Sequence, residues 1–183
     1  VTLTNAANDF TGALGVTSAD ATVVDADTLN LGPITVTGNL TVTTTTGDVT
    51  NTGGVLNVTG ATSVNVAGTE SITLDHAGND FGSAVTYTFG GGTGAIGSVA
   101  LTDNGAITLS PFGTPAADGV FIVDGNTDFT MTGSFALVSG GAITQAGTVD
   151  LVVGTTTTLN AGSNDITLAN TGNDLTGAVT STG

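Results

Sequence analysis

The 183-residue sequence has no lysine, arginine, cysteine or tryptophan, and only 8% of its residues are charged. A nucleic-acid interface needs cationic side chains against phosphates, so a formal charge of -15 excludes nucleic acid as a partner. The same lack of cations argues against docking on anionic lipid. No apolar run approaches the ~20 residues of a membrane-spanning helix, so we expect no membrane insertion. Without cysteine, stability must come from packing and hydrogen bonds rather than disulfides.

Glycine, threonine, alanine, valine and asparagine dominate what is present. Disordered chains combine low hydrophobicity with high charge density, whereas the mean hydropathy here is +0.37. Short runs alternate apolar and polar residues, as in Ile34–Val36, Leu40–Val42, Ile72–Leu74 and Ile107–Leu109. This alternation is typical of half-buried strands, and no stretch has the apolar stripe of a helix. The sequence therefore predicts an all-β fold.

One 14-residue unit occurs three times, at Val1–Leu14, Ile72–Val85 and Ile166–Val179. The first two copies start 71 positions apart and the last two start 94 apart. Alignment places the additional residues near 89–96 and 112–128. We therefore divide the chain into a first repeat (1–71), an enlarged second repeat (72–165) and the start of a third (166–183), all within one continuous solenoid.

Glycine spacing favours a solenoid over a sandwich, because the loops of a sandwich vary in length. The glycines at 47, 53, 60 and 68 recur at 141, 147, 154 and 162. The expected architecture is a parallel β-solenoid, in which a repeat makes about four coils of roughly 18 residues and the whole chain about ten coils. The insertion at 112–128 then has the length of one added coil. At a strand spacing of ~4.8 Å, ten coils would make a rod of roughly 45–50 Å.

The repeated Asn-Asp pairs are expected at corners, where their side chains bond to the local backbone. The apolar residue after each pair (Phe10, Phe81 or Leu175) is expected to point into the core. Neither end carries a capping helix, so the end coils are expected to have open strand edges.

The pattern of Ile72–Val85, together with Gly141–Gly154 and Thr156–Leu168, resembles the long β-strand repeats of filamentous haemagglutinin-like and autotransporter-type giant adhesins. This resemblance implies a right-handed parallel β-helix that holds an adhesive region away from a bacterial cell. The shafts of that family have no catalytic residues, so none is transferred. The adhesins usually contain some Lys and Arg, whereas this chain contains neither. A dedicated filament or sheath protein is therefore kept as an alternative.

Two candidate sites stand out among the polar residues. Asp124, Asn126 and Asp128 provide oxygens at alternate positions, as in the first half of a calcium loop. Phe129 replaces the loop glycine and Phe135 replaces the last ligand, so the alternative is a simple turn. Ca²⁺ is therefore the one candidate cofactor. His76, the single histidine, aligns with Asn5 and Asn170, which indicates a solvated corner residue rather than a base or ligand.

Catalytic and ligand-binding patterns are weak. Asp25 and Asp27 could form the carboxylate pair of a glycoside hydrolase, but Asp27 corresponds to Gly105 in the second repeat. We therefore predict that the chain is not an enzyme. Thr-x-Thr steps such as Thr41/Thr43 resemble ice-binding rows, but their irregular spacing indicates ordinary outward strand positions.

We thus predict a non-catalytic structural shaft segment of an extracellular bacterial adhesin or surface fibre, located at the cell surface. One alternative is a self-assembling filament or sheath subunit that stacks end to end. Another is a carbohydrate-binding module whose ligand contacts the insertion at 112–128. Neighbouring repeats or further copies of the chain are the expected partners, together with a host or glycan surface.

Overall fold

The computed structural model describes residues 1–82, 85–90, 96–111, 120–123, 129–146 and 149–183. In these ranges the chain forms strands joined by turns and contains no helix, and so none that could cross a membrane. The strands are β1 (Thr2–Leu3), β2 (Leu14–Ser18), β3 (Ala21–Asp25), β4 (Leu29–Val36), β5 (Leu40–Thr44), β6 (Val49–Thr50), β7 (Leu56–Val58), β8 (Thr62–Ala67), β9 (Ile72–Leu74), β10 (Asp80–Phe81), β11 (Val85–Gly90), β12 (Val99–Asp103), β13 (Ile107–Pro111), β14 (Val120–Val123), β15 (Phe129–Met131), β16 (Phe135–Ser139), β17 (Ile143–Gln145), β18 (Leu151–Val153), β19 (Thr157–Asn160), β20 (Ile166–Thr167), β21 (Asp174–Leu175) and β22 (Val179–Thr182).

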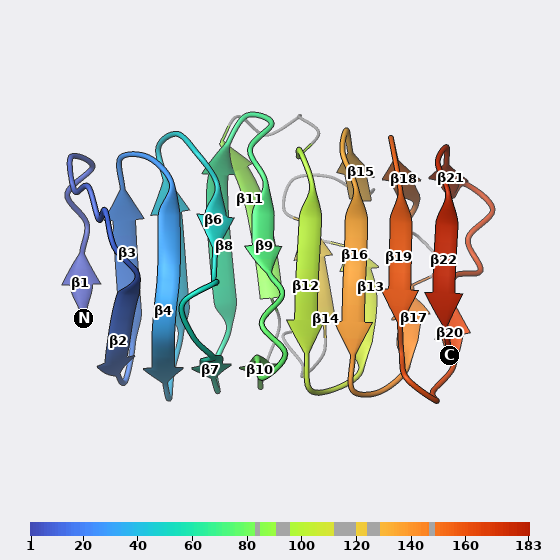
Figure 1. The fold of residues 1–183 in the computed structure, drawn as a ribbon, viewed down its shortest axis with the longest axis horizontal. Helices are drawn as coiled ribbons and strands as arrows, with labels where there is room; N and C mark the ends of the chain where they lie inside the picture. Colours follow the sequence, from blue (N-terminus) through green and yellow to red (C-terminus); the bar gives the residue numbers. More distant parts are fainter. Residues whose placement is uncertain (83–84, 91–95, 112–119, 124–128, 147–148) are drawn as a thin grey trace.

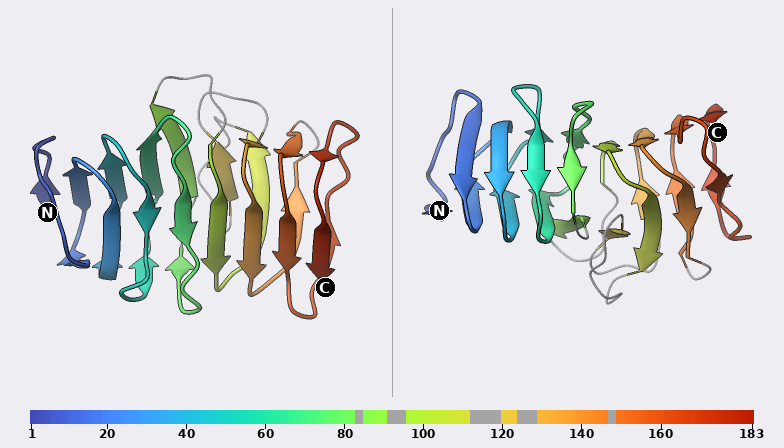
Figure 2. Two further views of the ribbon diagram at one scale, coloured as in Figure 1. Left: turned by 45° about the horizontal axis from the view of Figure 1, so that its top comes forward. Right: turned by 90° about the horizontal axis from the view of Figure 1, so that it is seen from below.

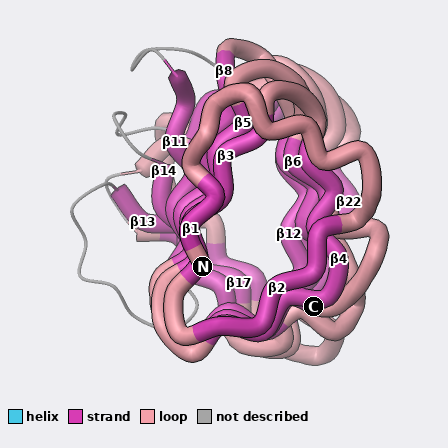
Figure 3. The backbone as a smooth tube through the Cα atoms, turned by 90° about the vertical axis from the view of Figure 1, so that its left-hand side faces the viewer, coloured by secondary structure: helices cyan, strands magenta, loops and turns pink. Residues whose placement is uncertain are grey.

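The strands pair in parallel and stack into a rod, with the two termini at opposite ends (Figures 1 and 2). A nine-stranded sheet, β1-β3-β5-β8-β11-β14-β13-β17-β20, forms one side. The other side belongs to a ten-stranded sheet, and a three-stranded sheet, β15-β18-β21, closes part of the rim. Seen from the N-terminal end, the chain runs clockwise as it recedes (Figure 3). The predicted right-handed parallel β-helix is therefore confirmed.

The solenoid has about seven turns, so the prediction of about ten coils is wrong. In the ten-stranded sheet, β4, β6, β9, β12, β16, β19 and β22 follow one another, one strand per turn. Most turns need more residues than the predicted 18, because each contains straight segments and polar corners. Ala21, for example, pairs with Leu40 at a distance of 19 positions, and Leu40 pairs with Thr62 at 22. At ~4.8 Å between strands the rod is about 35–40 Å long, and the nine-stranded sheet, with eight steps from β1 to β20 that include the inserted strand β14, spans about 38 Å.

Each repeat makes three and a half turns. The first repeat starts at β1, in the nine-stranded sheet, and passes through that sheet three more times, at β3, β5 and β8. Half a turn later the second repeat starts at β9, in the ten-stranded sheet. The third copy of the unit starts at β20, again in the nine-stranded sheet. Successive repeats therefore begin on opposite sides of the rod.

The insertion does not add a whole coil. Its strand β14 lies between β11 and β13 in the nine-stranded sheet, paired in parallel with both. On the opposite side β12 pairs directly with β16. The insertion therefore widens one sheet by one strand, and the predicted extra coil is wrong.

The core consists of apolar columns that run along the rod. In the ten-stranded sheet Leu29, Val49, Ile72, Val99 and Phe135 occupy one inward column, and each is at most 3% exposed. Each such fully buried side chain contributes ~1.5–3 kcal/mol. The strand residues between them face outward, which explains the alternation in the sequence.

The apolar residues of the Asn-Asp corners point inward, as predicted. Phe81 is 1% exposed in the middle of the rod. Phe10 and Leu175 pack against the same core but are only partly buried, because they lie in the first and last turns.

Candidate functional site

The Asn-Asp corner places an asparagine inside the turn. Nδ2 of Asn79, which is fully buried, donates to the carbonyl oxygen of Leu74 at 3.0 Å. Nδ2 of Asn8 donates to that of Leu3 at 3.3 Å. The predicted bonding to the local backbone is confirmed for the asparagines of the first two copies, and it holds a corner where the backbone leaves the strand ladder.

The same asparagines connect one turn to the turn before it. Oδ1 of Asn79 accepts hydrogen bonds from Nδ2 of Asn51 at 2.9 Å and from the backbone N–H of Leu56 at 3.0 Å. In the third copy, Oδ1 of Asn173 accepts from Nε2 of Gln145 and, at 2.9 Å, from the N–H of Leu151. The second and third copies thus share one amide bridge, which is buried in the second copy and part-buried in the third, where glutamine replaces asparagine.

Buried carboxylates complete two of the corners. Oδ1 of Asp25 accepts the backbone N–H of Phe10 at 3.1 Å, and Oδ1 of Asp103 accepts that of Phe81 at 3.1 Å. Asp25 and Asp103 are 0% and 3% exposed. They align in the repeats, so their shared identity was a sequence signal for this role. Oδ2 of Asp25 has no hydrogen-bond partner among the described residues.

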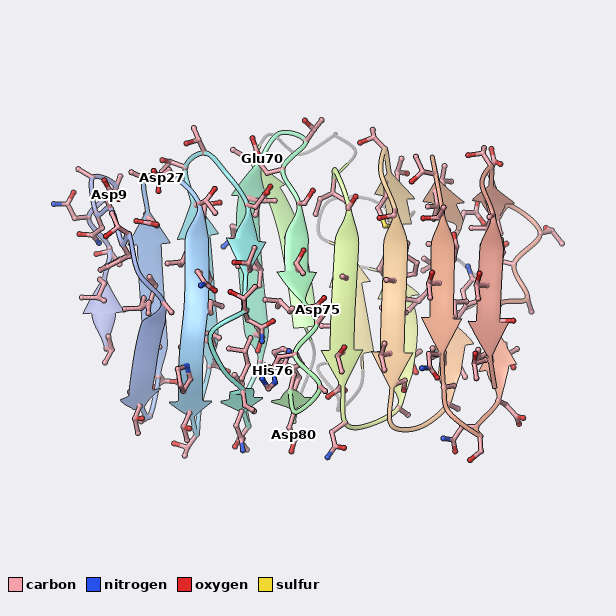
Figure 4. The ribbon with its side chains drawn as sticks, viewed as in Figure 1. Asp9, Asp27, Glu70, Asp75, His76 and Asp80 are labelled. Atoms are coloured by element: carbon pink, nitrogen blue, oxygen red, sulfur yellow. The ribbon has the colours of Figure 1, made fainter. Side chains whose placement is uncertain are left out.

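The carboxylate pair considered for glycoside hydrolysis is not brought together. Asp25 points into the core, whereas Asp27 is exposed at the edge of the rod (Figure 4). A buried carboxylate that accepts a backbone N–H fixes the stack and does not face a substrate.

A second ladder, which the sequence analysis missed, precedes the strands of the ten-stranded sheet. In each step a side-chain oxygen accepts the backbone N–H of the equivalent residue one turn later: Thr28 from Asp48, Asp48 from Ser71, Ser71 from Ser98, and Ser98 from Ser134. The N···O distances lie between 2.7 and 3.3 Å. Small polar residues are needed at this column because each must reach the next turn.

His76 performs the task of the asparagines with which it aligns. Its Nδ1 accepts the N–H of Gly78 at 3.3 Å, two residues on. Oδ1 of Asn5 accepts from Ala7 at 3.0 Å, and Oδ1 of Asn170 accepts from Gly172 at 3.2 Å. The histidine lies at a corner, with Asp75 and Asp80 on the same part of the chain (Figure 4). Its predicted role as a corner residue is confirmed.

The calcium candidates Asp124, Asn126 and Asp128 lie outside the described residues, so the site stays a prediction. Over the part of the chain that the structure describes, no group of three or more His, Cys, Asp or Glu residues could hold a metal ion. Of the insertion, the structure describes only β14.

Outward threonines are more regular than their spacing in the sequence indicates. Strand pairing aligns Thr2, Thr22, Thr41 and Ser63 in one row across four turns of the nine-stranded sheet. Turns of unequal length conceal this alignment in the sequence.

The stacked turns and shared corners define the chain as a β-solenoid repeat protein. A family described as repeats of unknown function (DUF5649) matches residues 18–88 and 97–182. These two segments cover most of the chain, which therefore belongs to the DUF5649 family. The interval between them, 89–96, is the region of the first insertion. No curated protein and no solved structure matches the chain.

Proposed function

We propose that the chain is a non-catalytic structural shaft segment of an extracellular bacterial adhesin or surface fibre. The observation that carries the proposal is the connection of successive turns by side-chain ladders. Asn51 and Asn79 bridge two turns in the core, and Ser71 and Ser98 continue a second ladder outside it. Rigidity along the axis is what a shaft requires.

Composition supports exposure outside the cell. With neither lysine nor arginine, the chain contains no cleavage site for trypsin-like proteases. Absence of cysteine leaves it independent of the redox conditions. A rod made of stacked turns also gains length through added turns without a change in its cross-section.

Spin labels at the two ends test the shaft role. The variant Thr2→Cys/Thr167→Cys places nitroxides on exposed residues of β1 and β20, the first and last strands of the nine-stranded sheet. The eight steps between them predict a distance of about 38 Å, to which the label lengths add. The control Thr22→Cys/Thr41→Cys labels adjacent turns at about 5 Å. A narrow distribution at the long distance supports the shaft, and a broad distribution centred well below it argues against a rigid rod.

A further inference from the structure

We propose that the outward face of β3, β5 and β8 binds ice. This threonine face consists of two outward rows, one of Thr22, Thr41 and Ser63 and the other of Val24, Thr43 and Asn65. The inference goes beyond the proposed shaft function and does not depend on it. β3 pairs with β1 on one side and β8 pairs with β11 on the other, so the face lies on the flank of the rod and involves neither end of the chain.

Strand pairing makes regular rows from residues that are unevenly spaced in the sequence. Thr22 pairs with Thr41 at a distance of 19 positions, and Thr41 pairs with Ser63 at a distance of 22. Figure 3 shows β3, β5 and β8 behind one another in the view along the rod. The irregular spacing in the sequence, which argued against ice-binding rows, is therefore absent from the folded chain.

The rows form a lattice with two repeat distances. Neighbouring turns place equivalent residues ~4.8 Å apart along the rod, and residues two positions apart on one strand are separated by ~6.6 Å. Both distances are comparable with the repeats of the ice lattice. A hydroxyl both donates and accepts hydrogen bonds, so it can take the place of a water molecule in such a lattice.

The hydroxyls of the first row are available to water. Within the described part of the chain, those of Thr22, Thr41 and Ser63 make no side-chain hydrogen bond to another residue. On the opposite sheet, by contrast, Oγ1 of Thr50 donates to Oδ1 of Asn30 at 3.3 Å. All six side chains of the threonine face are half-buried by their neighbours, which limits their movement.

The face also lacks charge, in a chain whose formal charge is -15. β3, β5 and β8 contain one ionisable residue, Asp25, which is inward and fully buried. Asp20 and Asp27 lie in the turns at the two ends of β3, and Figure 4 shows Asp27 and Glu70 at the rim of the rod. A charged group would lose hydration against a neutral lattice without gaining a counterion. An uncharged face complements such a lattice.

Two other occupants fit the face less well. Sugar rings stack on aromatic side chains, and β3, β5 and β8 contain none. A protein partner typically covers ~800 Å² on each side, whereas three strands of five residues offer only about 250 Å². A rigid face against a rigid lattice loses little conformational freedom, so a smaller area is sufficient.

Single ice crystals held just below their melting point in a solution of the chain test the proposal. The wild-type chain should convert rounded crystals into faceted ones, and it should be incorporated when ice grows slowly through the solution, as measured by mass spectrometry of the melted ice. Thr41→Lys places a long charged side chain in the centre of the face and should abolish both effects. Thr73→Lys is the matched control, because Thr73 is also half-buried and outward but lies in β9, on the opposite sheet.

Circular dichroism establishes that the variants are folded, and Thr22→Lys repeats the test one turn away if Thr41→Lys is not. Rounded crystals and exclusion of the wild-type chain from ice would overturn the proposal, as would equal effects of Thr41→Lys and Thr73→Lys. A wild-type dimer that Thr41→Lys dissociates would assign the face to a second copy and would also overturn it. None of these outcomes changes the spin-label distance that tests the shaft.

Discussion

Replacement of Asn79 by alanine should remove much of the stability of the central turns. The side chain is fully buried and takes part in three hydrogen bonds, with Leu74, Asn51 and Leu56. A buried polar group left without a partner costs about 1–3 kcal/mol. Since the N–H of Leu56 and the carbonyl of Leu74 lose these partners, we expect a loss of about 2–6 kcal/mol in the free energy of unfolding. The amide of Asn51 keeps its hydrogen bond to the carbonyl oxygen of Gly54.

The matched control is Asn8→Ala, at the equivalent corner of the first turn. Asn8 is half-buried and also donates two hydrogen bonds, to Leu3 and Val24. Water can replace these bonds, so the loss should be about 1 kcal/mol. The double variant Asn51→Ala/Asn79→Ala should cost less than the sum of the two single changes, because both single changes remove the same hydrogen bond between the two amides.

Urea unfolding followed by far-ultraviolet circular dichroism measures the wild-type chain and all four variants, Asn51→Ala included. The comparison is valid where the free energy of unfolding falls with urea concentration at the same slope in every chain. A changed slope would indicate that some turns unfold separately from the rest. Equal losses for Asn79→Ala and Asn8→Ala, or a loss below about 1 kcal/mol for Asn79→Ala, would refute the assigned importance of the buried amide bridge.

Three further predictions concern single features of the rod. Gly68 has a φ of 59°, and a β-carbon added there would meet no described atom within 4 Å. Gly68→Ala should therefore lower the free energy of unfolding by about 1–2 kcal/mol through backbone strain alone, as measured by urea unfolding. An unchanged free energy of unfolding would contradict this prediction. His76→Asn should preserve stability within about 0.5 kcal/mol, because Asn5 makes the equivalent turn bond, whereas His76→Ala should lose about 0.5–1 kcal/mol; a stabilising His76→Ala would argue against that bond. Sodium chloride raised from about 20 mM to about 0.5 M should increase the melting temperature, since a net charge of -15 repels itself, and a decrease would show that charge is not a destabilising term.

Much of the fold is predictable from the sequence because a repeated unit constrains it. Alternation identifies the inward residues, and the recurrent spacing of glycines between the repeats indicates stacked turns. Gly68 and Gly162, which align, both have positive φ, so one turn geometry recurs. The number of turns was not predictable, because the period of a repeat does not state how many turns it contains. Because each repeat makes three and a half turns, dividing the length of the repeat by a whole number does not give the length of a turn.

The polar corners were only partly predictable. The role of the Asn-Asp pairs follows from the preferences of those residues, but the ladder from Thr28 to Ser134 joins residues 20 to 36 positions apart. No fixed spacing in the sequence shows it. The alignment of Asp25 with Asp103 was a sequence signal for a common role, but it did not show that either is buried. Ionisable residues are rarely buried, and only the stacking of turns brings a backbone N–H to each carboxylate.

The half-turn left over in each repeat gives the rod an approximate twofold screw symmetry. Equivalent residues of successive repeats are separated by about 17 Å along the axis, for three and a half turns, and point in opposite directions. A flat surface lying along one side would therefore meet a given feature only in every second repeat. Two surfaces on opposite sides would each meet half of the copies, so such a rod could lie between them and contact both.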